Sequence, residues 1–114
     1  MSSDYRIIAT KRLQVSPNTE TYQEIYTVSP GKRLRLTKIE VFFPSGTLSE
    51  LQVRILQGWV GIAPTDGVLV GDNVKYEIEV DETYGSQSKV KAYLKNTNAT
   101  SSRECVITLI GQES

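Results

Sequence analysis

The chain has 114 residues, 39% of them hydrophobic, with 13 basic and 13 acidic side chains. This length and composition predict one globular β domain spanning residues 1–114 with a single core. The zero net charge disfavours a duplex-binding domain, and no apolar run approaches the ~20 residues of a membrane-spanning helix.

Most segments alternate polar and apolar residues with the period of two that marks a half-buried strand. In VKYEIEV (74–80), the apolar residues Val74, Tyr76, Ile78 and Val80 share one face. The predicted strands, in chain order, lie at residues 5–15 (one strand or two), 22–29, 33–43, 51–57, 67–71, 74–80, 89–94 and 104–111. Clusters such as SPNT, PTDG and NTNATSS separate them as turns, and a one-turn helix at 47–50 is left open.

The segment GKRLRLTKIEVFFPSG (31–46) changes the parity of its apolar residues part-way along. These residues are even-numbered before Thr37 and odd-numbered after Lys38, namely Leu34, Leu36, Ile39, Val41 and Phe43. All five can face the core only if a bulge or bend near Thr37 and Lys38 re-aims the strand. We therefore predict that regular pairing is interrupted there.

In ECVITLIG (104–111) both sides are apolar, which predicts a central strand covered on both faces.

Seven or eight antiparallel strands without helices predict an all-β fold, a single-domain two-sheet β-sandwich. The bent strand favours a jelly roll, in which long strands cross the sandwich. An immunoglobulin-like sandwich usually has paired cysteines, which this chain lacks, and a five-stranded barrel would leave strands over. Residues 1–15 form either an edge strand or an N-terminal arm that reaches a neighbouring molecule.

The strings TVSPGKRLRLTKIEVFFPSG, LQVRIL, GVLVGDNVKYEIEV and VKAYLKNTNATSSRECVITLIG follow one another through most of residues 22–111. A strand opens after Pro-Gly, a Gly-Asp turn leads into a long alternating strand, and an Asn/Ser-rich turn precedes the last strand. In this order the chain resembles small single jelly-roll virion proteins, the decoration, capsid or appendage modules of phages and archaeal viruses. The resemblance implies a structural role, and it transfers no functional residue.

Catalytic groups are few. The chain has no histidine, which removes the commonest general base and metal ligand. Its single cysteine, Cys105, lies within the apolar run CVITLI and is expected to be a buried hydrophobe. We therefore predict no enzymatic activity, no catalytic residue and no cofactor.

Four basic residues, Lys32, Arg33, Arg35 and Lys38, are candidates for a basic face. Such a stripe could contact an anion or nucleic acid, although nucleic acid is the weaker interpretation. The alternatives are a solvated outer face, protection of an edge strand, or a subunit interface.

The acidic residues Glu77, Glu79, Asp81 and Glu82 give a second charged segment. They could hold Ca²⁺, although no EF-hand spacing is present and we predict no metal site. Pairing with the basic strand, within or between subunits, is the other interpretation. The two halves of the chain differ in sign, since residues 1–57 hold eight Lys and Arg against five Asp and Glu.

The loop GWVGIAPTDG (58–67) places an aromatic residue between two glycines. If exposed, Trp59, Val60 and Ile62 would form an adhesive patch for a partner subunit, or Trp59 would stack on a sugar. If buried, they would close one end of the sandwich. Five tyrosines are further candidates for exposed aromatic residues, namely Tyr5, Tyr22, Tyr26, Tyr84 and Tyr93, and the first, second and fourth of these complete the set of interface candidates.

These features together predict a non-enzymatic structural or assembly protein that self-associates or decorates a larger particle, a virion component on the resemblance. Its expected partners are itself and other assembly proteins. The alternative is a carbohydrate-binding β-sandwich module that uses exposed aromatic residues. We expect no membrane association. The segment MSSDYRIIATKR lacks the apolar block of a signal peptide, so the expected location is the virion, if the source is viral, or otherwise the cytoplasm.

Overall fold

The computed structural model describes residues 6–114, which form eight strands joined by turns. The strands are β1 (Arg6–Val15), β2 (Thr19–Thr27), β3 (Leu34–Phe43), β4 (Leu51–Gln57), β5 (Val60–Ala63), β6 (Val74–Tyr84), β7 (Lys89–Asn96) and β8 (Arg103–Glu113). Residues 6–114 contain no helix long and apolar enough to cross a membrane.

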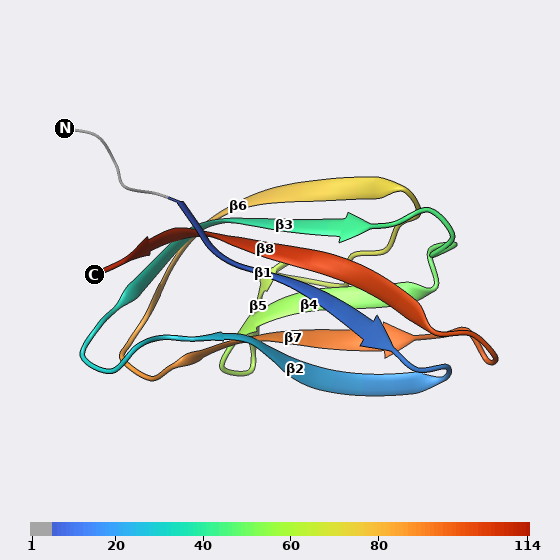
Figure 1. The fold of residues 1–114 in the computed structure, drawn as a ribbon, viewed down its shortest axis with the longest axis horizontal. Helices are drawn as coiled ribbons and strands as arrows, with labels where there is room; N and C mark the ends of the chain where they lie inside the picture. The colour runs from blue at the N-terminus through green and yellow to red at the C-terminus, as the bar shows by residue number, and fades with distance from the viewer. Residues whose placement is uncertain (1–5) are drawn as a thin grey trace.

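The strands form two four-stranded antiparallel sheets, which lie face to face in Figure 1. One sheet has the order β1-β8-β3-β6 and the other the order β2-β7-β4-β5. The pairings are nested, because β1 pairs with β8, β2 with β7, β3 with β6 and β4 with β5. The prediction of an all-β two-sheet sandwich with seven to eight antiparallel strands is confirmed.

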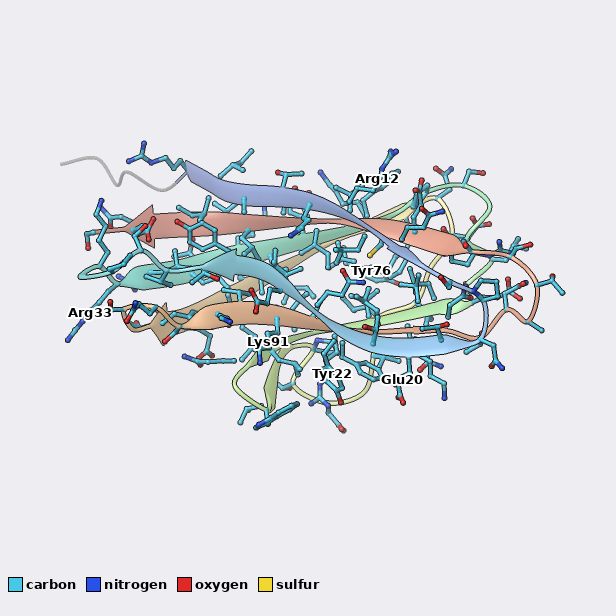
Figure 2. All side chains as sticks on the ribbon, turned by 60° about the horizontal axis from the view of Figure 1, so that its bottom comes forward. Arg12, Glu20, Tyr22, Arg33, Tyr76 and Lys91 are labelled. Atoms are coloured by element: carbon cyan, nitrogen blue, oxygen red, sulfur yellow. The ribbon has the colours of Figure 1, made fainter. Side chains whose placement is uncertain are left out.

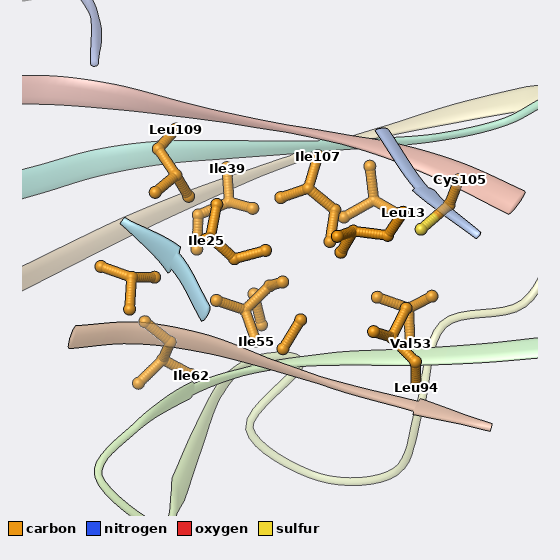
Figure 3. Close-up of a cluster of buried hydrophobic side chains, with 14 of the residues drawn as sticks. Leu13, Ile25, Ile39, Val53, Ile55, Ile62, Leu94, Cys105, Ile107 and Leu109 are labelled. Carbon is orange, nitrogen blue, oxygen red and sulfur yellow. The ribbon is translucent and has the colours of Figure 1, made fainter. Parts of the chain in front are cut away.

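The core lies between the two sheets, where their inward-facing residues meet (Figure 3). Ile39, Ile107 and Leu109 come from the first sheet and face Ile55 and Ile62 from the second. Cys105 is part of this core, as predicted, and burial raises the pKa of its thiol to about 12. A thiol in this state is a packing group, since the reactive thiolate is suppressed.

The interruption predicted in the third strand is present. Between Leu36 and Lys38, the register of β3 shifts against both of its neighbours, β6 and β8. The Thr37 hydroxyl at this point donates a hydrogen bond to the Ile110 carbonyl (3.2 Å). The five apolar residues of β3 that the parity change predicted to face the core are consequently buried, whereas Phe42 faces outward.

A glycine makes this bulge possible. A Cβ on Gly111 would lie 2.2 Å from the Arg35 carbonyl oxygen, far inside contact distance. Only glycine allows β8 to pass so close to the bulged backbone of β3. Substitution by alanine would force the central strands apart.

Several sequence-based details were wrong. Residues 67–71 form no strand, only an isolated bridge between Leu69 and Val53. Residues 47–50 form a turn with positive φ at Leu48 and Ser49 rather than a helical turn. The strand at 103–113 is central in its sheet, yet its outer face is only half-covered, because no further layer packs there.

The N-terminal segment is an edge strand over the residues described. β1 pairs with β8 from Arg6 to Val15, with one register shift between Ile7 and Ala9. The arm considered for residues 1–15 therefore does not exist within 6–15, and residues 1–5 lie outside the described part of the chain.

Candidate functional site

The outer face of the β2-β7-β4-β5 sheet carries a row of large side chains in register. Tyr22 on β2 lies opposite Tyr93 on β7, which lies opposite Arg54 on β4. The two tyrosine rings are in contact, with centroids 5.4 Å apart and planes inclined by 57°. Side chains paired across strands in this way stabilise one another and fix a flat surface.

Trp59 extends this row beyond the sheet. It lies in the β4–β5 turn, and 78% of its surface is exposed. Its ring meets Tyr22 edge to face, with centroids 5.6 Å apart. The Lys91 ammonium lies 5.4 Å from the centre of the indole, within cation–π range. Tyr22 and Lys91 project from the side of the molecule away from the other sheet (Figure 2).

We call this surface the Trp59 face. It consists of Tyr22, Leu56, Trp59, Val68 and Tyr93, with Glu20, Arg54 and Lys91 at its rim. An open pocket of about 340 Å³ lies within it, between the aromatic side chains, Glu20, Arg54, Leu56 and Val68. The pocket therefore has apolar walls and is also lined by the carboxylate of Glu20 and the guanidinium of Arg54.

Two polar groups of the pocket are held in place. The Tyr93 hydroxyl donates a hydrogen bond to the Glu20 carboxylate. Burial, and then this bond, raise the pKa of Tyr93 to about 12, so the phenol stays protonated at neutral pH. Arg54 donates to the carbonyls of Pro64 (3.2 Å) and Thr65 (2.5 Å).

The guanidinium of Arg54 crosses Gly61, where a Cβ would lie 1.9 Å from its Nε. A side chain at this position would displace the flexible end of Arg54 and so change the wall of the pocket. The arrangement is suited to binding by ring stacking and hydrogen bonding.

The structure divides the predicted interface candidates. Trp59, Val60 (68% exposed) and Tyr22 are exposed, and Trp59 and Tyr22 lie together on the Trp59 face. Val60 pairs with Gln57, whose side chain points toward the other sheet and donates to the Thr83 carbonyl, so Val60 is not part of this face. Ile62 is buried in the core, at the point where β5 shifts its register against β4. Of the three loop candidates, Trp59 alone contributes to the Trp59 face.

Tyr84 was wrongly predicted as an exposed interface residue. It is 1% exposed and its hydroxyl donates to the Leu56 carbonyl (3.2 Å). Burial is the main reason that its pKa is raised. Tyr5 lies outside the described residues.

The basic-face candidates do not form one stripe. Lys32 and Arg33 lie in the loop before β3. Arg35 pairs with Asp81 (3.2 Å), and Lys38 pairs with Glu77 (2.7 Å). The interpretation as edge protection was wrong, because β3 lies between β8 and β6.

The acidic and basic segments therefore pair within the chain. Hydrogen bonding from Lys38, and then Lys75, lowers the pKa of Glu77, and Glu77 in turn raises the pKa of Lys38. Within residues 6–114, no three His, Cys, Asp or Glu residues are placed to hold a metal ion.

Sequence reasoning did not assign Glu20, Arg54, Val68 and Tyr93 to one site. The alternation of residues 89–94 does place Tyr93 outward, and that signal was available. The register that aligns Tyr93 with Tyr22 and Arg54 joins three strands far apart in the chain, and no local pattern encodes it.

No protein-family model and no curated protein matches the sequence. Among solved structures, a similar chain is the solution NMR structure of a de novo designed double-stranded β-helix. It has 14% sequence identity and a TM-score of 0.37, over 90% of this chain and 97% of that chain. A TM-score this low carries no argument about the fold or function of this protein.

Proposed function

We propose that this protein is a non-enzymatic structural or assembly protein that attaches to copies of itself or to a larger particle through the Trp59 face. The observation that carries the proposal is the exposure of Trp59 and Tyr22 side by side. Contiguous exposed apolar side chains are costly in water and mark interaction surfaces. Tryptophan and tyrosine are also the residues that dominate interface energies.

Jelly-roll topology is part of the same proposal. The nested pairing of the first strand with the last, the second with the seventh, and so on inward supports it. In such a fold one long hairpin is rolled into two sheets. Together with the resemblance to small virion proteins, this topology favours a role as a virion component.

The attachment would use the face in two ways. The indole of Trp59 and the ring of Tyr22 would be desolvated against an apolar patch on the partner. At the rim, Glu20 and Lys91 would set the orientation of the partner, since rim charges chiefly provide specificity.

Truncation of Trp59 tests the proposal. The oligomeric mass is measured by light scattering over a range of concentrations for the wild type and Trp59→Ala. We expect association to weaken about 30-fold, corresponding to the ~2 kcal/mol of a tryptophan hot spot. Phe42→Ala is the matched control, because Phe42 is an exposed aromatic residue on the other sheet. Equal association in wild type and Trp59→Ala, or no association of the wild type, would contradict self-assembly through this face.

Carbohydrate binding is the second candidate function. The pocket of about 340 Å³ favours it, because aromatic walls and fixed polar groups occur together there. Stacking on Trp59 and hydrogen bonds to Glu20 and Arg54 would hold a sugar ring. A glycan array probed with the same two variants separates this function from assembly. Silence of the wild type across the array excludes it, whereas a signal lost only in Trp59→Ala supports it.

A further inference from the structure

The outer edge of β6 is open along its whole length. β6 has 11 residues and pairs only with β3 among residues 6–114. In Figure 1 it runs along the margin of its sheet with no strand beyond it. The backbone groups on the free side of such a strand can pair with another strand.

The inward face of β6 is also incompletely covered. Its apolar residues, Val74, Tyr76, Ile78 and Val80, are only half-buried. On the neighbouring strand β3, Ile39 and Val41 are fully buried. At the corresponding edge of the second sheet, β5 has only four residues, and beyond it β6 meets only a loop, in which Leu69 bridges to Val53 and Val70 accepts a hydrogen bond from Tyr76. A further strand beside β6 would bury this stripe.

The outward face of β6 carries a charge pattern that can match a second copy of itself. Lys75, Glu77 and Glu79 follow one another at alternate positions. If two copies pair antiparallel about Glu77, Lys75 of each copy lies opposite Glu79 of the other. Opposite charges facing each other across strands are favourable.

The central residue of this pairing is already neutralised. Each Glu77 has Lys38 at 2.7 Å and Lys75 at 3.3 Å within its own chain. Two Glu77 carboxylates can therefore approach across the symmetry axis. Glu79, by contrast, has no ion-pair partner in residues 6–114 and is available to Lys75 of the other copy.

Other registers are less favourable. A slip by two residues in one direction places Lys75 opposite Asp81 of the other copy, but it also places Glu77 opposite Glu79, and these repulsive pairs offset the favourable ones. A slip in the other direction places Lys75 opposite Glu77, which already has Lys38 and Lys75 of its own chain, and it leaves Glu79 opposite Asn73, which precedes the strand. The register about Glu77 instead pairs residues 74–80 and ends at Val80, the first residue of the irregularity where β6 shifts against β3.

We propose that two copies of the chain pair through β6, antiparallel about Glu77, to form a symmetric dimer. The two β1-β8-β3-β6 sheets then become one continuous sheet. On the inward face, Val74 lies opposite Val80 and Tyr76 opposite Ile78 of the other copy, and each stripe covers the other. The interface is isologous, as two-fold dimers require. This inference names a contact distinct from the Trp59 face and stands without it.

Complementary charge variants test both the contact and its register. The dimer dissociation constant is measured by sedimentation for Glu79→Lys, Lys75→Glu and an equal mixture of the two. Each variant alone places two like pairs across the axis, and we expect about tenfold weaker dimerisation. The mixture restores two opposite pairs in the heterodimer and should regain the affinity of the wild type. Asp66→Lys, an exposed acid in a loop, is the control for the charge change.

A monomeric wild type at millimolar concentration would overturn the proposal. A dimer dissociation constant that either charge variant leaves unchanged would also overturn it. The same holds if the mixture of the two variants dimerises no more tightly than each variant alone. Trp59→Ala should leave this dimer intact, so the β6 contact and the Trp59 face can fail independently of one another.

Discussion

The two edges of the β1-β8-β3-β6 sheet are built differently. At β1 the register shifts between Ile7 and Ala9, and Lys11 lies on the inward face opposite Ile107. The Lys11 ammonium reaches the other sheet and donates to the Glu24 carbonyl (3.3 Å). Bulges and inward-pointing lysines are the devices by which proteins prevent edge-to-edge pairing. From Val74 to Glu79, β6 has neither.

The difference follows from what lies beside each edge. A short turn joins β1 to β2, so the two sheets close on each other along that side. On the opposite side, the eleven residues of β6 face the four of β5 and the loop after it, where the Tyr76 hydroxyl donates to the Val70 carbonyl (2.6 Å). The β1 edge is thus protected from pairing by its own bulge and lysine, whereas the β6 edge is open because β5 is short. The two edges of one sheet can therefore have different roles.

The largest effect on dimerisation is expected when β6 receives an inward-pointing lysine like Lys11 of β1. In Val80→Lys, the new charge lies on the inward face at the end of the paired stretch, residues 74–80. We expect dimerisation to weaken about 100-fold, because the ammonium must be desolvated or the pairing lost. Sedimentation equilibrium measures this change.

Thr83→Lys is the control for Val80→Lys. It adds the same charge to β6 at an exposed position outside residues 74–80. Equal weakening by the two variants would show that charge, and not position, governs association. It would remove the distinction between the two edges.

A moderate effect is expected from opening the β1 edge. Lys11→Val removes the inward charge and leaves an apolar residue opposite Ile107. We expect new, concentration-dependent association, with stability changed by only about 0.5 kcal/mol, since Lys11 is exposed. Light scattering detects the additional species, and Arg12→Val, on the outward face of the same strand, should give less. Unchanged mass would mean that the bulge alone protects β1.

The smallest effect is a pH dependence at the β6 edge that the β1 edge does not share. The bonds from Lys38 and Lys75 lower the pKa of Glu77 below its ordinary value of 4.5. Its contribution to stability is therefore present above the unfolded pKa and is lost as the pH falls through the lower, folded pKa. We expect acid to loosen β6 from β3 before β1 loosens from β8.

Amide hydrogen exchange, corrected for intrinsic rates, measures this loosening at each strand. The Lys38→Gln variant should show a weaker acid dependence at β6, because the first cause of the lowered pKa is gone. Parallel loosening of both edges would argue against a specific role for Glu77.

The sequence predicts most of the strands because burial on one face imposes a period of two. The parity change about Thr37 even located the bulge, since the five apolar residues on the core face of β3 had to be buried. The same rule, carried beyond Val80, would have placed Tyr84 inward, because it has the same parity as Val74. That error came from ending the strand too early.

Other features are beyond local patterns. Which strands are neighbours is set by the assembly of the whole sandwich, and so β3 could not be recognised as an inner strand. The exposure of Trp59 depends on the direction of the β4–β5 turn and on Tyr22, which is distant in the chain. Likewise, the need for glycine at position 111 arises only where β8 meets the bulge.

Pairing through β6 has a geometric consequence for the Trp59 face. Antiparallel strands that share inward and outward faces are related by a two-fold axis perpendicular to their sheet. The two β2-β7-β4-β5 sheets of the dimer therefore lie on the same side, and both copies of Trp59 point in one direction. A particle surface with repeated sites would meet both at once. Such bivalent engagement can raise the overall avidity by about 10²–10⁴ without any new contact. An individually weak face would then be sufficient for stable attachment.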